Sequence, residues 1–582
     1  MDIFSFLSLF GGLAIFLYGM NAMGDALERS SAGKLKSFLG NVTKNPLGAV
    51  LLGAGVTAII QSSSATTVMV VGFINSGIME LGQSIGIIMG ANIGTTITSW
   101  ILSLSGIQSD NVFIQLIKAQ NLAFLVSVVG IVLIMMSKND KKKDIGTIFL
   151  GFAMIMVGMD IMSGAVEPLK NNEQFHQILL LFENPLLGVL MGAVLTAIIQ
   201  SSSASVGILQ ALSVSVSISY GSAIPIILGQ NIGTCVTAVL SAIGANKNAK
   251  RAAAIHLSFN IIGTLVFLIL FYIVKFVFNP AIFGESVNGA GIAVVHTLFN
   301  VTSTVVMFPF IKQLEKLAYV LIRPEKQKEE KTELLDERLL VTPPVAIAQA
   351  TRVTHEMADI AKNSLIDSLS LIFDYDNAKA KRIYEDEKAV DRYEDKIGTY
   401  LVKLSRESLS IVDSHEASNL LHTIGDFERI SDHAINIVDV AKEIHEKGIV
   451  FTDKAVKEMK VLIAALSEIL DNTVAAFQND DIELAKRIEP LEQVIDKIRF
   501  ILKQRHIERL QNNECTIETG FVFSDFITNC ERVADHCSNI GVCLIQVAKD
   551  RFDTHQYLKN VKESHNEVFE NMYNKYEAKY SI

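Results

Sequence analysis

The stretch NPLGAVLLGAGVTAIIQSSSA, residues Asn45–Ala65, decides how this chain is read. Its long apolar run ends in a glutamine followed by three consecutive serines. The pattern returns at Asn184–Ala204 as NPLLGVLMGAVLTAIIQSSSA, and 16 of the 21 aligned positions are identical without a gap. A polar Gln-Ser-Ser-Ser motif placed twice within apolar sequence predicts a helix that breaks inside a membrane, which is tolerated only where protein or a cavity surrounds the break.

The similarity extends beyond the two motifs. The same offset of 139 residues relates Gly19 to Gly158, and it relates GANIGTTIT at 90–98 to GQNIGTCVT at 229–237. One offset that holds for three separated segments indicates a duplicated half of the chain rather than a coincidence of composition.

Charge divides the chain into two parts. Residues 184–246 contain no Asp, Glu, Lys or Arg, and 45–117 contain only Glu80 and Asp110, whereas mixed charge is dense after residue 323. The first part is therefore predicted to be membrane-embedded and the second water-soluble. The net charge of −10 argues against nucleic acid as the main partner. Five cysteines, four of them in the soluble part, indicate a reduced compartment rather than a disulfide framework.

The predicted fold class is all-α, with a polytopic membrane domain at 1–320. Its repeats cover about 1–103 and 140–243, and the segments 45–78 and 184–219 are predicted as re-entrant hairpins with the Gln-Ser-Ser-Ser motifs at their tips. Long apolar runs predict spans at 3–23, 82–103, 112–137, 145–166, 222–243, 250–276 and 288–312, of which 112–137, 250–276 and 288–312 lie outside the repeats.

Basic residues give the orientation in a plasma membrane. Three basic clusters are expected inside, which leaves the N-terminus outside and the C-terminal domain in the cytoplasm. The additional span at 112–137 then inverts the second repeat relative to the first. Inverted repeats are typical of alternating-access secondary transporters with sites near the midplane. The clusters are Arg29, Lys34, Lys36 and Lys44; Lys138 and Lys141–Lys143; and Lys247, Lys250 and Arg251.

The motifs supply the chemistry of an anion site. Serine is a strong helix N-cap, and the N-terminus of a helix offers free N–H groups and a positive dipole end to an anion. The hydroxyl and amide oxygens also suit Na⁺, and the Asn-Ile-Gly-Thr segments at 92–95 and 231–234 are expected to be unwound, polar helix ends. The candidate anion-binding residues are Gln61, Ser62, Ser63, Ser64, Gln200, Ser201, Ser202 and Ser203.

Two alternatives stand beside this interpretation. Small polar residues also mediate packing between membrane helices, but the doubling of the motif favours a site. Because the core offers no Arg or Lys to neutralise an anion, a cation-coupled carrier is favoured over a basic anion pore. His256 and His296, in the related contexts HLSFN and HTLFN, are expected to make polar helix contacts rather than to handle protons.

With these motifs, residues 1–312 resemble the type II sodium-dependent phosphate cotransporter family. The resemblance implies Na⁺-driven symport of inorganic phosphate, with the serine motifs at the substrate and cation site. Phosphate rests on the resemblance, because the chemistry alone indicates only a small anion coupled to a cation. The implied sodium-binding residues are Ser64, Thr66, Asn92, Thr95, Ser203, Asn231 and Thr234.

The soluble part also repeats, beyond a polar linker at 321–345. GDFERISDHAINI at 425–437 returns as TNCERVADHCSNI at 528–540, and a second Glu-x-x-x-Asp pair recurs with an offset of 105 residues. Residues four apart share one helix face, so each pair is either a solvated surface or a metal site, which His433 and His536 would assist. The candidate ligands of divalent or transition metal ions are Glu387, Asp391, Glu428, Asp432, Glu492, Asp496, Glu531 and Asp535.

Residues 346–555 resemble PhoU-domain proteins, which are tandem three-helix bundles able to bind metal clusters, and 556–582 form a C-terminal tail. The resemblance implies a regulatory role in phosphate homeostasis. A phosphate-sensing membrane protein, a carrier of another oxyanion and a phosphate exporter remain alternatives, and a homodimer is left open. An enzyme is not expected, because the sequence shows no Walker loop, no HExxH motif and no nucleophile–base arrangement.

Overall fold

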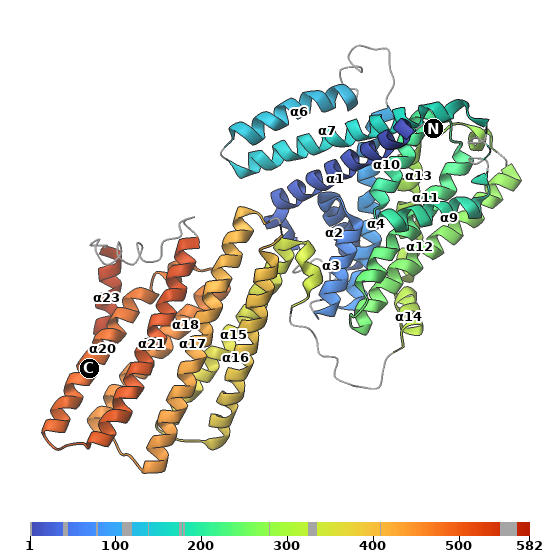
Figure 1. The fold of residues 1–582 in the computed structure, drawn as a ribbon. Coiled ribbons are helices and arrows are strands. Elements are labelled where there is room, and N and C mark those ends of the chain that lie inside the picture. The colour runs from blue at the N-terminus through green and yellow to red at the C-terminus, as the bar shows by residue number, and fades with distance from the viewer. Residues whose placement is uncertain are drawn as a thin grey trace. The chain divides into compact units, whose positions relative to one another are not determined.

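The computed structural model describes residues 3–38, 45–76, 79–106, 119–137, 139–173, 177, 181–278, 280–323, 335–407, 409–547 and 567–582. It contains two compact units, Met1–Val345 and Ala346–Ile582, and each is considered by itself (Figure 1). Nearly all of the described chain is helical, and the only extended pairing found there is an isolated bridge between Ser219 and Ser286. The predicted all-α class is confirmed.

The first unit holds the duplicated sequence. Its main helices are α1 Ile3–Phe38, α2 Pro46–Ile60, α3 Ser63–Asn75, α4 Leu81–Ser103, α6 Ala119–Met136, α7 Asp140–Val166, α9 Pro185–Ile199, α10 Ser202–Ser215, α11 Tyr220–Ser241, α12 Lys247–Ile273, α13 Gly289–Met307 and α14 Ile311–Leu321. Short 3₁₀ turns include η2 Leu104–Gly106, η3 Glu167–Asn171 and η7 Glu337–Val341.

Six of the seven predicted spans coincide with helices of this unit that are long and apolar enough to cross a membrane. The seventh, 112–137, is represented by α6, and its residues 112–118 lie outside the described ranges. The six helical stretches are Ile3–Ser30, Leu81–Ser103, Asp140–Lys170, Tyr220–Ser241, Lys247–Phe278 and Gly289–Leu321.

Both serine motifs break a helix, as the sequence predicts. The break separates α2 from α3 at Gln61 and Ser62, and it separates α9 from α10 at Gln200 and Ser201. The re-entrant path of these helix pairs through a bilayer stays a prediction.

Equivalent helices of the two repeats pack on each other reciprocally. A Cβ on Gly19 of α1 would lie 2.7 Å from the carbonyl oxygen of Gly151 in α7, and one on Gly158 would lie 2.7 Å from that of Gly12. Gly12 and Gly151 are equivalent positions, as are Gly19 and Gly158, so α1 and α7 run antiparallel about a pseudo-two-fold axis. The same reciprocity holds for two further pairs, because α3 of the first repeat packs on α11 of the second, and α10 of the second repeat packs on α4 of the first. The predicted inversion requires this geometry.

Glycines also bring α2 onto α4 and α9 onto α11. A Cβ on Gly90 would lie only 2.0 Å from the carbonyl oxygen of Val50, and one on Gly229 would lie 2.0 Å from that of Val189. Only a glycine permits so close a backbone approach, and the approach fixes each half-helix that leads to a serine motif.

The Asn-Ile-Gly-Thr segments are not unwound, so that expectation is wrong. Both α4 and α11 continue as α-helix through these residues. Thr95 Oγ1 donates to the carbonyl oxygen of Ala91 at 3.0 Å, and Thr234 Oγ1 donates to that of Gln230 at 2.9 Å. The hydroxyls thus bond to the preceding turn instead of ending the helix, and the glycines in these segments serve close packing.

The second unit is a helical array. Its helices are α15 Pro343–Leu371, which begins at the end of the first unit, then α16 Asn377–Leu404, α17 Ile411–Lys447, α18 Asp453–Asn479, α19 Ile482–Ala485, α20 Ile488–Gln511, α21 Ile517–Val547 and α23 Glu567–Lys579. The first repeat contributes α15–α17 and the second α18, α20 and α21, and α17 packs on α21 (Figure 1). In the predicted tail, α23 packs on α20, whereas 556–566 lie outside the described residues.

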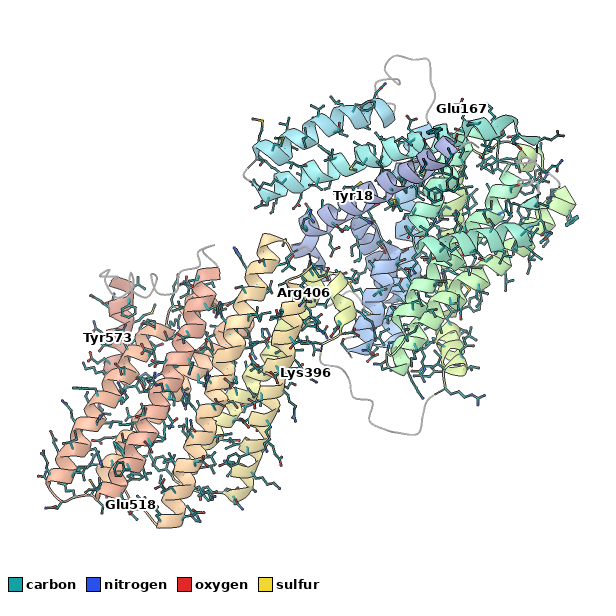
Figure 2. All side chains as sticks on the ribbon, in the orientation of Figure 1. Tyr18, Glu167, Lys396, Arg406, Glu518 and Tyr573 are labelled. Carbon is teal, nitrogen blue, oxygen red and sulfur yellow. The ribbon has the colours of Figure 1, made fainter. Side chains whose placement is uncertain are left out.

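The core of this unit is apolar and its rim is charged. Leu462, Leu466 and Ile469 of α18 are fully buried, which explains why this helix is also apolar enough to be a candidate span. At the rim, Glu518, labelled in Figure 2, pairs with Lys447 across α21 and α17 at 2.9 Å. All five cysteines of the chain are free thiols in the structure, and burial raises the pKa of Cys537 to about 12.

Two glycines on one helix test the packing of α2. Gly53→Ala should destabilise the protein, because the added Cβ would lie 2.1 Å from the carbonyl oxygen of Ile87, and overpacking of this kind costs about 1–3 kcal/mol. Gly55→Ala is the matched control, since nothing lies within 4 Å of its added Cβ. Thermal unfolding in detergent should show a lower Tm for the first variant only, and equal Tm values would contradict the close approach.

Candidate functional site

The first serine motif is built around a left-handed glutamine. Gln61 ends α2 with φ 59° and ψ 19°, a conformation that costs a residue with a Cβ about 1–2 kcal/mol. Its backbone N–H still donates to the carbonyl oxygen of Thr57 at 2.8 Å, which completes the last turn. The right-handed helical backbone of α2 therefore ends at this single residue.

The serine after this glutamine starts the next helix. Ser62 has extended backbone angles, and its Oγ accepts from the backbone N–H of Ala65 at 3.1 Å, so it is the N-cap of α3. The backbone N–H groups of Ser63 and Ser64 belong to the first turn, where no preceding helical carbonyl is available. A free pair of donors and the positive dipole end therefore point out of the break.

The side chain of Gln61 is held inside the first repeat. It is buried, its Nε2 donates to the carbonyl oxygen of Ala58 at 2.5 Å, and its Oε1 accepts from Thr98 Oγ1 of α4 at 2.8 Å. Thr57 Oγ1 donates to Thr66 Oγ1 at 3.0 Å across the break. The hydroxyls on both sides of the first break are thus bonded to each other.

The second motif has the same backbone and different side-chain contacts. Gln200 has φ 60° and ψ 19°, and Ser201 caps α10 by accepting from the N–H of Ala204 at 3.2 Å. The side chain of Gln200 is exposed, however. Thr237, the equivalent of Thr98, donates instead to the carbonyl oxygen of Thr234 in its own helix at 2.8 Å.

Sequence reasoning overlooked two hydroxyls at the second break. Thr196 and Ser205 are the equivalents of Thr57 and Thr66 by the offset of 139 residues. Both are fully buried, and neither hydroxyl oxygen has a hydrogen-bond partner within the described residues. The shared offset was the signal that would have identified them. The second break therefore offers two buried oxygens with unused hydrogen-bonding capacity, a costly arrangement without a ligand.

The two motifs meet in space. Ser64 Oγ lies 3.5 Å from the backbone carbonyl oxygen of Gln200, although 136 residues separate them in sequence. Ser63, Ser202 and Ser203 are buried close to the same two breaks. The candidate anion-binding residues of both repeats thus belong to one region of the unit.

The predicted sodium-binding residues divide into two groups. Thr66 bonds within the first break, and Ser64 and Ser203 lie in the first turns after the breaks. Asn92 of α4 instead donates through Nδ2 to Asn260 Oδ1 of α12 at 3.2 Å, which makes it a helix contact.

The remaining amide and hydroxyl groups of this set bond locally. Asn231 Nδ2 donates to the carbonyl oxygen of Ile227, while Thr95 and Thr234 bond to their own helices as described above. The hydrogen bonds described for Asn92, Thr95, Asn231 and Thr234 are accordingly with the helices α4, α11 and α12, and sodium binding by these residues stays a prediction.

Two buried histidines lie on α12 and α13. The ring nitrogens of His256 and His296 have no hydrogen-bond partner among the described residues, so the polar helix contact expected for them is not formed there. Their backbone carbonyls accept from Asn260 and Asn300. Arg251 is the only buried charged residue in the described part of 45–310, and its Nε donates to the carbonyl oxygen of Ile322. Among the described residues of 45–310, no cationic side chain is therefore buried beside the motifs.

In the second unit, one set of predicted metal ligands converges. Carboxylate oxygens of Glu387, Asp391 and Asp432 lie within 4.8 Å of one another, the only such group in the described residues. Burial, reinforced by the charges of Asp391 and Asp432, raises the pKa of Glu387. Burial and the charge of Asp432 likewise raise the pKa of Glu428. Oxygen-only ligands of this kind fit a hard divalent cation.

The equivalent set in the second bundle is neutralised by an arginine. Arg499 lies 2.9 Å from Asp496 and 3.6 Å from Glu531, measured between guanidinium nitrogen and carboxylate oxygen. The equivalent position in the first bundle is Glu394, by the offset of 105 residues. Asp535 pairs with Arg532 at 3.6 Å, as Asp432 pairs with Arg429 at 3.7 Å in the first bundle, so the difference between the two sets is Arg499. The residues of the first bundle therefore fit a metal ion, and those around Arg499 do not.

The two histidines of the repeated motif bond across the bundles rather than with these carboxylates. His536 Nδ1 lies 2.9 Å from Asp426 Oδ1, and His433 Nδ1 lies 2.8 Å from Asn529 Oδ1. His536 and Asp426 also line a cleft of about 1000 Å³ beside the acidic cluster. The cleft residues are Asp391, Glu394, Asp395, His422, Gly425, Asp426, Glu428, Arg429, His536, Asn539, Val542, Cys543 and Gln546.

Each half of the chain matches a known protein family. The family model described as Na⁺/Pi-cotransporter matches residues 15–164 and 158–297, and the PhoU domain model matches 354–441 and 460–543. A protein of Escherichia coli strain K12 named for inorganic phosphate export, YjbB, is 26% identical over 543 residues, which are 90% of this chain and 95% of that protein.

Two further matches cover single parts. Sodium-dependent phosphate transport protein 2A of Rattus norvegicus is 34% identical over 99 residues, 16% of this chain and 15% of that protein. The crystal structure of PhoU from Pseudomonas aeruginosa matches 35% of this chain and 99% of its own length, with 19% identity and a TM-score of 0.34. With both family models matched in order along its length, the chain belongs to the Na⁺/Pi-cotransporter family and includes a C-terminal PhoU domain.

Proposed function

We propose that the protein is a sodium-coupled symporter of inorganic phosphate that works by alternating access, with phosphate held between the two serine motifs. The observation that supports this most directly is the 3.5 Å approach of Ser64 Oγ to the carbonyl oxygen of Gln200, together with membership of a phosphate transporter family. Two capped helix starts that face one region offer donors to one oxyanion from both repeats.

The anion is bound without a basic side chain. The first-turn N–H groups of α3 and α10, the serine hydroxyls and the two helix dipoles supply neutral donors and positive ends. Because no Arg or Lys is buried beside the motifs, the charge of phosphate is balanced by co-bound Na⁺. The coupling of the two ions follows, since each makes binding of the other less costly.

The sodium site includes the orphaned hydroxyls of the second break. The hydroxyl oxygens of Thr196 and Ser205 are buried and have no hydrogen-bond partner in the part of the chain that the structure describes, and the exposed amide of Gln200 lies between them in sequence. In the first repeat the equivalent hydroxyls, those of Thr57 and Thr66, are hydrogen-bonded to each other. Na⁺ prefers neutral oxygen ligands, so the open hydroxyls of the second break suit it better than the closed pair.

The difference between the two breaks describes one state of the transport cycle. Gln61 is bonded into its own repeat through Thr98, whereas Gln200 is free to turn toward a ligand. In an inverted repeat, the opposite-facing state exchanges the conformations of the two halves. The cycle would therefore release Gln61 from Thr98 and bond Gln200 to Thr237.

The direction of phosphate transport in the cell depends on the Na⁺ and phosphate gradients. A symporter moves its substrate whichever way the combined Na⁺ and phosphate gradients favour, so the proposed mechanism accommodates both the phosphate export in the name of YjbB and the sodium dependence in the name of the rat protein. Positive residues at 138–143 and 247–251 support a cytoplasmic location of the PhoU domain. There it would regulate transport, with a divalent metal ion held by Glu387, Asp391 and Asp432.

The two glutamines provide the first test of the site. Gln61→Ala and Gln200→Ala should each lower Na⁺-dependent phosphate uptake about tenfold or more, because a lost hydrogen bond to a charged ligand costs about 1.5–3 kcal/mol. Uptake of ³²P-phosphate is measured at matched membrane expression. Ser213→Ala, further along α10, is the control and should transport normally. Normal uptake in both glutamine variants would remove these residues from the site.

The orphaned hydroxyls test the sodium site separately. Thr196→Val and Ser205→Ala should raise the Na⁺ concentration for half-maximal uptake by about three- to tenfold, as expected for loss of one neutral ligand worth about 1 kcal/mol. At saturating Na⁺ the apparent KM for phosphate should change little. Thr147→Val on α7 is the control. An unchanged Na⁺ dependence in both variants would exclude these oxygens as ligands.

The metal site of the PhoU domain is tested with Mn²⁺ as a probe on the full-length protein. Asp391→Asn should weaken Mn²⁺ binding by about tenfold or more, while Asp496→Asn, its equivalent beside Arg499, should leave it unchanged. Metal binding requires ionised carboxylates, and the pKa of Glu387 is raised, so protons compete at a higher pH than for an ordinary glutamate. Affinity measured by titration calorimetry should therefore fall as pH decreases. Equal losses in both variants would contradict the assignment.

A further inference from the structure

A short turn of the first unit is docked on one of the half-helices of the site. The turn is η7, Glu337–Val341, which follows the linker and packs on α3. Leu339 is fully buried, and a Cβ added to Gly72 of α3 would lie 2.7 Å from its Cδ2 atom. The bare backbone at Gly72 therefore forms the seat in which the leucine lies.

The two repeats differ at this seat. Position 72 corresponds to Ala211 in α10 by the offset of 139 residues, so the second repeat has a side chain where the first has none. The backbone carbonyl of Ala211 accepts from Ser163 Oγ of α7 at 2.8 Å instead. Gly72 is thus a departure from the repeat that coincides with the docked turn, and it is not explained by the duplication itself.

The turn continues along the chain into α15, the first helix of the PhoU domain. Asp336 is buried and accepts from the N–H of Arg338 at 2.9 Å, which starts the turn. The N–H of Thr342 donates to the carbonyl oxygen of Leu339, and that of Val345 donates to the carbonyl oxygen of Thr342. The chain then continues directly into α15, which begins at Pro343 and runs beyond the first unit.

The same end of α3 is fastened on its other side. Asn75 Oδ1 accepts from the backbone N–H of Asn246 at 2.7 Å, and Asn246 Nδ2 donates to the carbonyl oxygen of Asn75 at 3.0 Å. Asn246 is the N-cap of α12. The end of α3 that lies away from the serine motif is therefore held between α12 and η7.

We infer that η7 is a coupling element through which the PhoU domain sets the position of α3 and thereby controls transport. This inference rests on the proposed transport function. A short α-helix moves as a rod, and Gly72 lies nine residues from Ser63, which is about 14 Å along the helix. A displacement of η7 with α15 is thus transmitted to the first turn of α3, where phosphate donors and Ser64 are located. The docked turn restrains α3, and transport requires that the turn move.

A disulfide across the contact tests the inference in the full-length protein. The Cβ added to Gly72 would lie 3.8 Å from the Cβ of Arg338, within the span of about 3.5–4.5 Å that a disulfide bridges. Gly72→Cys with Arg338→Cys is prepared in a Cys515→Ser background, because Cys515 is the one native cysteine that is not buried. A protease site inserted within 324–334 makes the cross-link visible, since linked fragments stay together on a non-reducing gel.

Two matched pairs serve as controls. Ala211→Cys with Arg338→Cys uses the equivalent position of the other repeat, and Gly72→Cys with Val341→Cys uses an exposed residue of the same turn. Neither pair should cross-link under the oxidation that links the test pair. The uncut test pair should lose Na⁺-dependent phosphate uptake by about fivefold or more on oxidation, and reductant should restore it, as a coupling of about 1 kcal/mol or more requires.

The outcomes separate the two proposals. The test pair is made in two versions, alone and with Leu339→Ala, which removes the Cδ2 atom that would lie 2.7 Å from the new Cβ. Failure of both versions to cross-link would overturn the docking of η7, and a cross-link with unchanged uptake would overturn the coupling. Absence of Na⁺-dependent uptake in the reduced parent protein would refute the proposed function, while cross-linking would still report whether the turn is docked.

Discussion

The left-handed conformation of Gln61 and Gln200 is the constraint on which the membrane unit depends. It ends one helix and lets the following serine cap the next, so that backbone donors are freed deep inside an apolar unit. Such a strained, partly unsatisfied backbone is costly, and it is sustained by the surrounding helices. Glycine contacts press α2 onto α4 and α9 onto α11 and hold each break in place. In the proposed function these donors form an anion site without a basic side chain, and a second ion balances the charge of the anion.

Because of the duplication, the unit contains two broken helices whose breaks lie close to each other. Reciprocal packing of α1 on α7 brings the repeats into register, and Ser64 meets Gln200 where the two breaks face each other. Small differences in side chains and in their contacts distinguish the two halves. Thr196 and Ser205 leave oxygens open in one half, Gly72 makes room for a turn in the other, and Arg499 replaces a carboxylate in the second PhoU bundle.

Much of this was predictable from the sequence, because repeats and apolar runs are strong signals. The two breaks, six of the spans and the helical second half follow from periodicity and from the recurrence of Gln-Ser-Ser-Ser. The Asn-Ile-Gly-Thr segments were misjudged, since glycine beside polar residues indicates a break as readily as it indicates close helix packing. The difference between Gln61 and Gln200 was not predictable, because identical motifs bond differently according to Thr98 and Thr237. Convergence of Glu387 with Asp432 likewise depends on packing between helices, which sequence spacing does not encode.

The coupling of phosphate to sodium is tested most directly by flux in proteoliposomes of the full-length protein. Labelled phosphate is followed under an inward Na⁺ gradient, under an outward Na⁺ gradient, and with Na⁺ replaced by choline. The account predicts accumulation in the first case, net loss from preloaded vesicles in the second and little movement in the third, because Na⁺ must balance the bound anion. Equal phosphate flux in Na⁺ and in choline would contradict it.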